Sequence, residues 1–211
     1  MNRSYLKIAA LLILVLSGLC PGQAIGGAKN APSGVARLQQ SYVWYDGQHE
    51  RQIWLNPSLV AEFHVGKNNA ARNAVKSVYA NAELVATHGA VRLWRLGSGV
   101  VSSTAVRALS SVNQTGNYSP VLHDGPTTTG RMRALPGNMI VYLDPAWDSA
   151  AVTAWANKHQ FEIIKKLEIG PNIYIIKTGP GLEALNTANA LYKSGEVVAA
   201  FPDWWEEVTT R

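Results

Sequence analysis

The side chains that most often carry catalysis or bind metals are sparse and scattered in this chain. Five histidines are present, and no two of them stand three or four residues apart: His49, His64, His88, His123 and His159. None is accompanied by cysteines or paired carboxylates at the spacing of metal ligands. We therefore expect no metal site and no bound cofactor.

Nucleophile and phosphate motifs are also missing from the sequence. It contains no Gly-x-Ser-x-Gly elbow, no phosphate loop and no dinucleotide fingerprint. Gly97-Ser98-Gly99 lacks the third glycine of a nucleotide loop, and His88-Gly89 is typical of a turn between strands. The adjacent carboxylates Glu206 and Glu207 should diverge and stay solvated. We predict a protein that is not an enzyme; the alternative, a hydrolase of unrecognised type, requires a pocket where a histidine meets a serine or a carboxylate.

The N-terminus has the pattern of an export signal. Arg3 and Lys7 form a basic start, and an apolar run follows at residues 8–19. Such a run is long enough for a signal peptide and too short to span a bilayer. Gly22-Gln23-Ala24 fits the small-x-small pattern of a cleavage site. We therefore predict a signal peptide at residues 1–24 and a secreted or periplasmic protein.

The cysteine count and the charge limit the partners of the mature chain. The only cysteine, Cys20, lies in the predicted signal, and the large Leu19 before it disfavours a lipid anchor. The mature chain would therefore have neither a disulfide nor a thiol nucleophile. The net charge of +5 falls to about +3 without the signal, and no basic stripe is interleaved with aromatic residues. We expect no nucleic-acid partner, and the lack of a second long apolar run predicts no membrane span.

A repeated pattern of strands and helices organises the rest of the chain. A hairpin at residues 41–55, turning at Asp46-Gly47, precedes the repeat. Two series of elements then follow in the same order, about 80 residues apart. Each helix shows apolar residues at the spacing of a core-facing face, and Asn69 and Asp148 stand at N-cap positions. The expected strands are 59–63, 83–85, 91–96 and 119–122, then 139–143, 162–164, 173–177 and 201–204; the helical stripes are Ala71, Ala74, Val75 and Val78; Val106, Leu109 and Val112; Val152, Trp155, Ala156 and His159; and Leu185, Ala188 and Leu191.

This pattern predicts an α+β fold of two tandem ferredoxin-like βαββαβ units, each an antiparallel sheet with its helices on one face. The alternative is one mixed α/β domain whose halves look alike by accident. The sequence divides into the signal peptide (1–24), a flexible lead-in (25–40), the hairpin with the first unit (41–124), a linker rich in Gly, Pro and Thr (125–137), the second unit (138–205) and a C-terminal tail (206–211).

Two adjacent tryptophans close the second unit. Because neighbouring residues of a strand point to opposite faces, one of Trp204 and Trp205 should face the core and the other should point outward. An outward tryptophan at the end of a sheet is either a rim residue or an interface anchor, and the sequence leaves both readings open.

The second unit resembles the N-terminal prodomain of subtilisin-like serine proteases, the fervidolysin-type prodomain in particular. Three segments carry the resemblance: Gly137-Asn138-Met139-Ile140-Val141-Tyr142-Leu143, Leu182-Glu183-Ala184-Leu185-Asn186 and Val197-Val198-Ala199-Ala200-Phe201-Pro202-Asp203-Trp204. The first unit with its hairpin is similar to the degenerate unit that precedes such a prodomain in some secreted subtilases, and Tyr118-Ser119-Pro120-Val121-Leu122 is its closing strand.

The resemblance implies a non-catalytic chaperone and inhibitor of a subtilisin-like protease. In that family the open face of the sheet packs on two protease helices, whose N-termini nearby carboxylates can cap. The C-terminal tail lies in the substrate cleft as an added strand, which would place Arg211 before the scissile bond. The implied protease-binding residues are Pro202, Asp203, Trp204, Trp205, Glu206, Glu207, Val208, Thr209, Thr210 and Arg211.

Other functions remain compatible with the same residues. The sequence ends where the family's protease domain would begin, so the protein is expected to act in trans or to be a remnant of a subtilase. It could also be an envelope or extracellular interaction module that kept the prodomain fold for another partner. The tail could equally be a frayed, solvated terminus.

Overall fold

The computed structural model describes residues 37–63, 70–97, 101, 103–112 and 116–207. All of them fall within one compact unit, Val35–Arg211. The predicted signal peptide, the expected cap Asn69 and the tail residues 208–211 lie outside the described residues.

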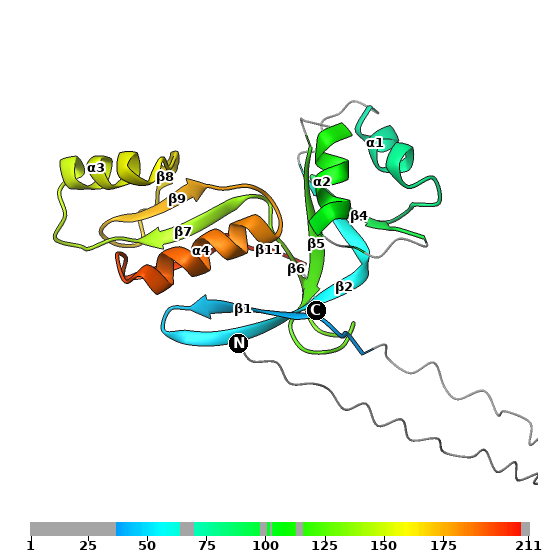
Figure 1. The fold of residues 1–211 in the computed structure, drawn as a ribbon, viewed down its shortest axis with the longest axis horizontal. Coiled ribbons are helices and arrows are strands. Elements are labelled where there is room, and N and C mark those ends of the chain that lie inside the picture. Colours follow the sequence, from blue (N-terminus) through cyan, green and yellow to red (C-terminus); the bar gives the residue numbers. More distant parts are fainter. Residues whose placement is uncertain (1–36, 64–69, 98–100, 102, 113–115, 208–211) are drawn as a thin grey trace, which may run out of the picture. The chain divides into compact units, whose positions relative to one another are not determined.

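The described residues form two series of strands and helices (Figure 1). The first series is β1 (Ser41–Asp46), β2 (His49–Phe63), α1 (Ala70–Val78), β3 (Glu83–His88), β4 (Val91–Arg95), α2 (Ser103–Val112), β5 (Asn117–His123) and β6 (Met132–Ala134). The second series is β7 (Asn138–Tyr142), α3 (Ser149–His159), β8 (Ile163–Lys166), β9 (Ile173–Lys177), α4 (Leu182–Ser194), β10 (Ala199–Pro202) and β11 (Trp205–Glu206).

Both series build the same sheet topology. The first sheet contains the strand order β5-β2-β4-β3, and the second sheet has the order β10-β7-β9-β8. In each, the unit's last strand lies beside its first strand, followed by its third and second, and every pair is antiparallel. This is the ferredoxin-like order. The predicted fold class, α+β with two tandem ferredoxin-like units after a hairpin, is confirmed.

Strand β2 is longer than expected because the hairpin and the first unit share it. We expected one strand to end near residue 55 and another to begin at residue 59, but a single strand of 15 residues runs through Pro57. A register shift against β5 between Leu55 and Val60 absorbs the proline. The Asn56 side chain stabilises this bulge, since its Oδ1 accepts hydrogen bonds from the Ser58 amide and hydroxyl, both at 3.0 Å.

Two further short strands extend the first sheet. Residues 125–137, expected to be a linker, include β6, which pairs with β5. The C-terminal segment supplies β11, which pairs with β6 through Trp205 opposite Ala134 and Glu206 opposite Arg133. The full order of the first sheet is therefore β11-β6-β5-β2-β4-β3, and β1 pairs with the N-terminal part of β2, off this path.

Helix α4 contributes to the cores of both halves. The first core contains Val60, Val75, Trp94 and Leu109 from the first half, and it also contains Leu185 of α4. One and two turns further on, Ala188 and Leu191 pack into the second core, beside Met139, Val141, Trp155 and Ile176. A single rigid helix thus joins the two cores, and the β1–β2 hairpin lies along it (Figure 1).

Local signals at element ends are present where the sequence predicted them. Asp148 caps α3, accepting a hydrogen bond of 2.8 Å from the Ala151 amide. Gly195 ends α4 with a φ of 72°, and Gly47 turns the hairpin with a φ of 59°. Within the part of the chain that the structure describes, no helix is both long and apolar enough to cross a bilayer.

Candidate interaction surface

The second sheet presents an apolar face on the side opposite its helices. Ile140 of β7 lies between Ile175 of β9 and Phe201 of β10, which are its register partners. Tyr142 stands on the same face, with its ring edge-on to Phe201 at 5.6 Å. All four side chains are half-buried, and Phe201 also packs against the first core. Because alternate residues of these strands fill the helix-side core, the strands must present this second row on the other face.

Polar and charged groups surround this apolar face. Lys165 is the register partner of Ile175, and Lys177 pairs with Glu162 at 2.7 Å. At the closing end, the Asp203 amide donates to the Asn138 carbonyl at 3.1 Å, and the Asn138 side-chain amide lies 3.5 Å from the Asp203 carboxylate. The surface thus has an apolar centre and a charged rim, the composition of a protein-binding face.

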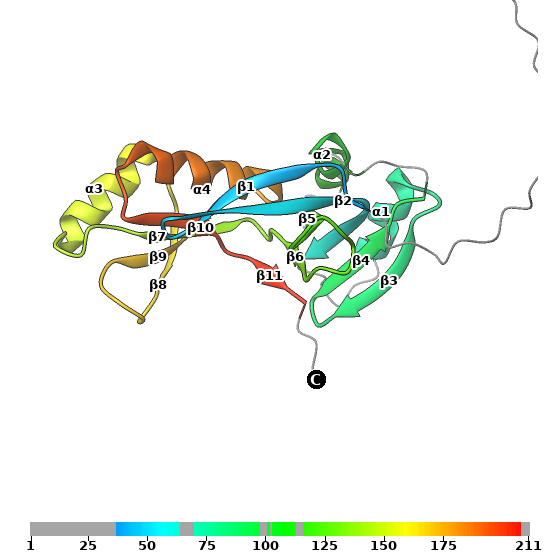
Figure 2. The same ribbon diagram turned by 90° about the horizontal axis from the view of Figure 1, so that it is seen from below.

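The matching face of the first sheet is filled by the chain itself. A third hydrophobic cluster covers it, with Phe63, Leu93 and Val121 at its centre and Met132 and Trp205 packed against them. Trp205 comes from one edge strand of this sheet, yet its ring lies 5.8 Å from that of His88 on the opposite edge strand. A flat sheet would separate β11 from β3 by about 24 Å, five strand spacings. The first sheet therefore curls over its own open face, and β11 ends beside the β3–β4 hairpin (Figure 2).

The segment implied to bind a protease is engaged within the chain as far as residue 207. Pro202 ends β10 opposite Met139, and the Glu207 amide donates to the Met132 carbonyl at 3.1 Å. Trp204 and Trp205 point to opposite faces, as expected, but neither is free. Trp204 packs edge-on against Trp44 at 5.4 Å in the first core, and Trp205 packs in the third cluster. The remaining implied residues, Val208, Thr209, Thr210 and Arg211, lie outside the described residues.

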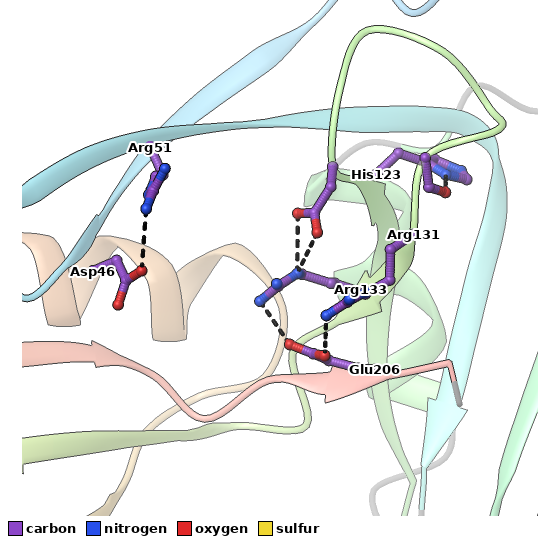
Figure 3. Close-up of polar contacts among 8 residues, drawn as sticks. Asp46, Arg51, His123, Arg131, Arg133 and Glu206 are labelled. Atoms are coloured by element: carbon purple, nitrogen blue, oxygen red, sulfur yellow. Dashed lines mark hydrogen bonds and ion pairs between the residues drawn. The ribbon is translucent and has the colours of Figure 1, made fainter. Parts of the chain in front are cut away.

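Arg133 is the centre of the contacts that hold this segment. Its guanidinium lies 5.5 Å from the ring of Trp44 and 5.6 Å from that of Trp204, which is cation–π geometry. The same group pairs with Asp124 at 3.0 Å and with Glu206 at 2.8 Å (Figure 3). Its side chain is only 12% exposed. One arginine thus ties together the hairpin, the end of β5 and the C-terminal strand.

A second arginine and a histidine complete the attachment. Arg131 also pairs with Glu206, at 2.9 Å, as Figure 3 shows. His88 lies 3.6 Å from Glu207. Our sequence reasoning missed Arg131 and Arg133. Two arginines that alternate in a predicted linker, together with adjacent glutamates near the C-terminus, were a signal of strand pairing between opposite charges.

A buried carboxylate belongs to the first core rather than to a site. Glu62 is 1% exposed. It accepts hydrogen bonds from the indole N–H of Trp94 at 2.8 Å and from the Tyr118 hydroxyl at 3.2 Å, and Arg92 lies 3.9 Å away. These partners offset the cost of burying its charge, so the arrangement is structural.

Two further histidines, His123 and His159, also have structural partners. The ring of His123 is buried, with Nε2 3.1 Å from the Asn56 side-chain amide and Nδ1 2.9 Å from the Gly130 carbonyl. His159 and Lys158 both lie close to the Glu196 carboxylate, at 2.9 and 3.0 Å. These contacts hold the pKa of Glu196 below its usual range, with Lys158 the larger cause. Among the described residues, no group of three or more possible ligands could hold a metal ion.

A mixed groove of about 670 Å³ runs between α2 and α4. Val106, Pro120 and Leu182 give it apolar walls, and the charged Arg107 and Glu183 also line it. Tyr42 borders the groove, and burial raises the pKa of its hydroxyl, while the hydrogen bond from Gln40 opposes that shift. The groove lies on the helix side and is separate from the apolar sheet face.

Comparisons with known proteins do not place the chain in a family. No family model matches it, and no curated protein matches it. One similar solved structure is a crystal structure of a protein assigned as a glycine cleavage system transcriptional repressor. It is 15% identical, with 71% of this chain and 96% of that chain covered, at a TM-score of 0.20. A likeness this low carries no argument about function.

Proposed function

We propose that the protein is a secreted or periplasmic, non-catalytic prodomain-like protein that acts as a chaperone or inhibitor of a subtilisin-like serine protease. The observation that carries the proposal is the apolar face of the second sheet, formed by Ile140, Tyr142, Ile175 and Phe201. This face lies in the unit whose sequence resembles the prodomain, and it is the face on which prodomains of that family pack.

The rim of the face fits helix termini in a partner. The Asp203 carboxylate stands at the closing end of the second sheet, next to Asn138. A carboxylate there can accept hydrogen bonds from the free amides at the N-terminus of a protease helix, where it also meets the positive end of the helix dipole. Docking would place the apolar centre under the helices and Asp203 at their ends.

The proposal separates two activities that the family combines. The sheet face would support folding of the protease, while the tail would inhibit by entering the substrate cleft as a strand. Because Trp204 to Glu207 are bound to the first sheet, insertion would start after Glu207 or require β11 to detach. Removing residues 208–211 should therefore weaken inhibition and leave assistance to refolding intact.

The experiment is a titration of the purified protein against secreted subtilases, scored by inhibition and by recovery of activity during refolding. Ile175→Lys should weaken both effects at least about tenfold, because it places a charge at the centre of an apolar interface. Val112→Lys is the matched control, since Val112 is an exposed apolar residue of α2, outside the face. If the wild-type protein neither inhibits nor assists any of these enzymes, the proposal fails.

The attachment of the C-terminal segment favours a second candidate. An interaction module that kept the prodomain fold for a different partner would use the same sheet face and would leave residues 204–207 on the first sheet. It predicts that Ile175→Lys abolishes capture of that partner while no subtilase is bound.

N-terminal sequencing of the exported protein would test the predicted processing after residue 24.

A further inference from the structure

The underside of the first sheet contains a strand-binding site that is already filled. Its floor is the third cluster, its edge is β6, and its occupant is the segment from Trp204 to Glu207. The two tryptophans of the occupant are held on different sides: Trp204 packs in the first core, and Trp205 packs on the third cluster. The ring of Trp205 lies 6.5 Å from that of Phe63 and 5.8 Å from that of His88.

The first acidic residue of the occupant is recognised by charge, and the second lies beside a histidine. Glu206 pairs with Arg131 at 2.9 Å and with Arg133 at 2.8 Å, and Glu207 faces His88 at 3.6 Å. The main chain adds the ladder with β6 and the hydrogen bond from the Glu207 amide to the Met132 carbonyl. An added strand bound by its main chain, with pockets for alternate side chains, is the arrangement of peptide recognition by β-augmentation.

Several features of β11 favour its opening before the central strands of the sheet. Strand β11 has only two residues, and it lies at the edge of the sheet. Glu206 is 36% exposed, so its ion pairs are open to screening by salt. Trp205 is half-buried rather than fully buried. Short edge elements with few buried contacts open far more often than core strands do.

We infer that the first sheet has an exchangeable strand-binding site, occupied in cis by residues 204–207, that accepts an extended segment of a partner protein. The chemistry of the occupant defines the partner segment, which carries an aromatic residue followed by two acidic residues. The aromatic ring fits between Phe63 and His88, the first acid meets Arg131 and Arg133, and the second acid meets His88. This site is distinct from the apolar face of the second sheet and does not depend on the proposed protease.

The test uses the full-length protein and a labelled peptide with the sequence of residues 203–207, measured by fluorescence anisotropy. The peptide can bind only the fraction of molecules whose own strand is displaced, so the apparent affinity falls in proportion to that fraction. Glu206→Gln should raise apparent peptide affinity about tenfold, because the resident strand loses two partly exposed ion pairs. Hydrogen exchange at the Glu207 amide should accelerate by a similar factor in the same variant.

Matched variants distinguish strand exchange from general loosening. Glu196→Gln also removes a carboxylate that pairs with two cationic side chains, but in the second half, and it should leave peptide affinity unchanged. Adding Arg133→Met to Glu206→Gln should abolish binding, and so should an alanine at the peptide position of Trp205. Circular dichroism of each variant would check that it is folded.

Three results would overturn the inference. The first is equal peptide binding by wild type and Glu206→Gln, including none by either. The second is binding of the alanine peptide as tightly as the native one. The third is a concentration-dependent dimer of Glu206→Gln without peptide, which would show that the occupant is a second copy of the chain instead of a partner protein.

Discussion

The two halves share a topology but differ in what covers the open face of the sheet. In the second half, Ile140, Tyr142 and Ile175 belong to none of the described hydrophobic clusters. In the first half, Phe63, Leu93 and Val121 occupy the corresponding side of the sheet, and Met132 and Trp205 close over them. The same fold thus leaves the face of one sheet uncovered, while the chain's own residues cover the face of the other.

The difference comes from what is attached to each unit. The first sheet gains β6 and β11 at its β5 edge, and these extra strands allow it to curl until His88 meets Trp205 and Glu207. In the second sheet, β10 and β8 form the ends of a four-stranded order. The four-stranded sheet of this chain keeps its edges apart, whereas the edges of the extended sheet meet through side chains.

The largest effect is expected from a substitution that removes the contact between helix α4 and the first core. Leu185 is 1% exposed and lies in the first core, although its helix belongs to the second half. Leu185→Ala should lower the free energy of unfolding by about 3 kcal/mol, through lost burial and the cavity left behind. Because α4 is shared, hydrogen exchange should accelerate in β2 and β5 and also in β7 and β9.

The control for this variant is Leu191→Ala, which truncates a residue of the same helix in the second core. It should cost a similar free energy in urea unfolding. If hydrogen exchange in the Leu185→Ala variant accelerated only in the first half of the molecule, the two halves would open independently. Helix α4 would then not couple them.

Much of this architecture follows from local sequence signals. The apolar stripes of α3 and α4 and the cap Asp148 depend on residues within a few positions of each other, so they can be recognised one element at a time. The order of strands and helices then predicts the ferredoxin-like unit, because few compact arrangements satisfy it.

The closure of the first sheet could not be obtained in the same way. It depends on Glu206 meeting Arg131 and Arg133, some 75 residues away in the sequence. Nothing local to either segment requires that meeting. Likewise, Leu185 was correctly placed on a helical stripe, but the stripe itself does not say that part of it serves the other half. We expected separate strands before residue 55 and after residue 59, but β2 continues between them through a bulge stabilised by Asn56.

Substitutions on the open faces of the two sheets should differ in their cost to stability. Trp205→Ala should lower the free energy of unfolding by about 2 kcal/mol. This is less than for a fully buried tryptophan, because the Trp205 side chain is half-buried. The loss also cannot exceed the free energy with which β11 docks on the sheet. Exchange should accelerate in β6 and in the third cluster and stay unchanged in β7 and β9. Ile175→Ser, on the other sheet's face, should cost less than about 1 kcal/mol. Equal costs, measured by urea unfolding, would mean that both faces are covered to the same extent.

The smallest expected effect is a pH dependence confined to the second half. Hydrogen bonds from Lys158 and His159 hold the pKa of Glu196 below its usual range. The folded state therefore favours the ionised form, so this contact stabilises the protein above the unfolded pKa of a glutamate and is lost as the pH falls through the lower, folded pKa. An NMR titration should show the Glu196 carboxyl titrating at lower pH in the folded protein than in the urea-unfolded chain. Glu196→Gln should remove this part of the acid sensitivity at the C-terminal end of α3 and leave the closure of the first sheet unchanged. If the Glu196→Gln variant also lost protection from hydrogen exchange in β11, the Glu196 contact would influence both halves. The independence of the two surfaces would then be refuted.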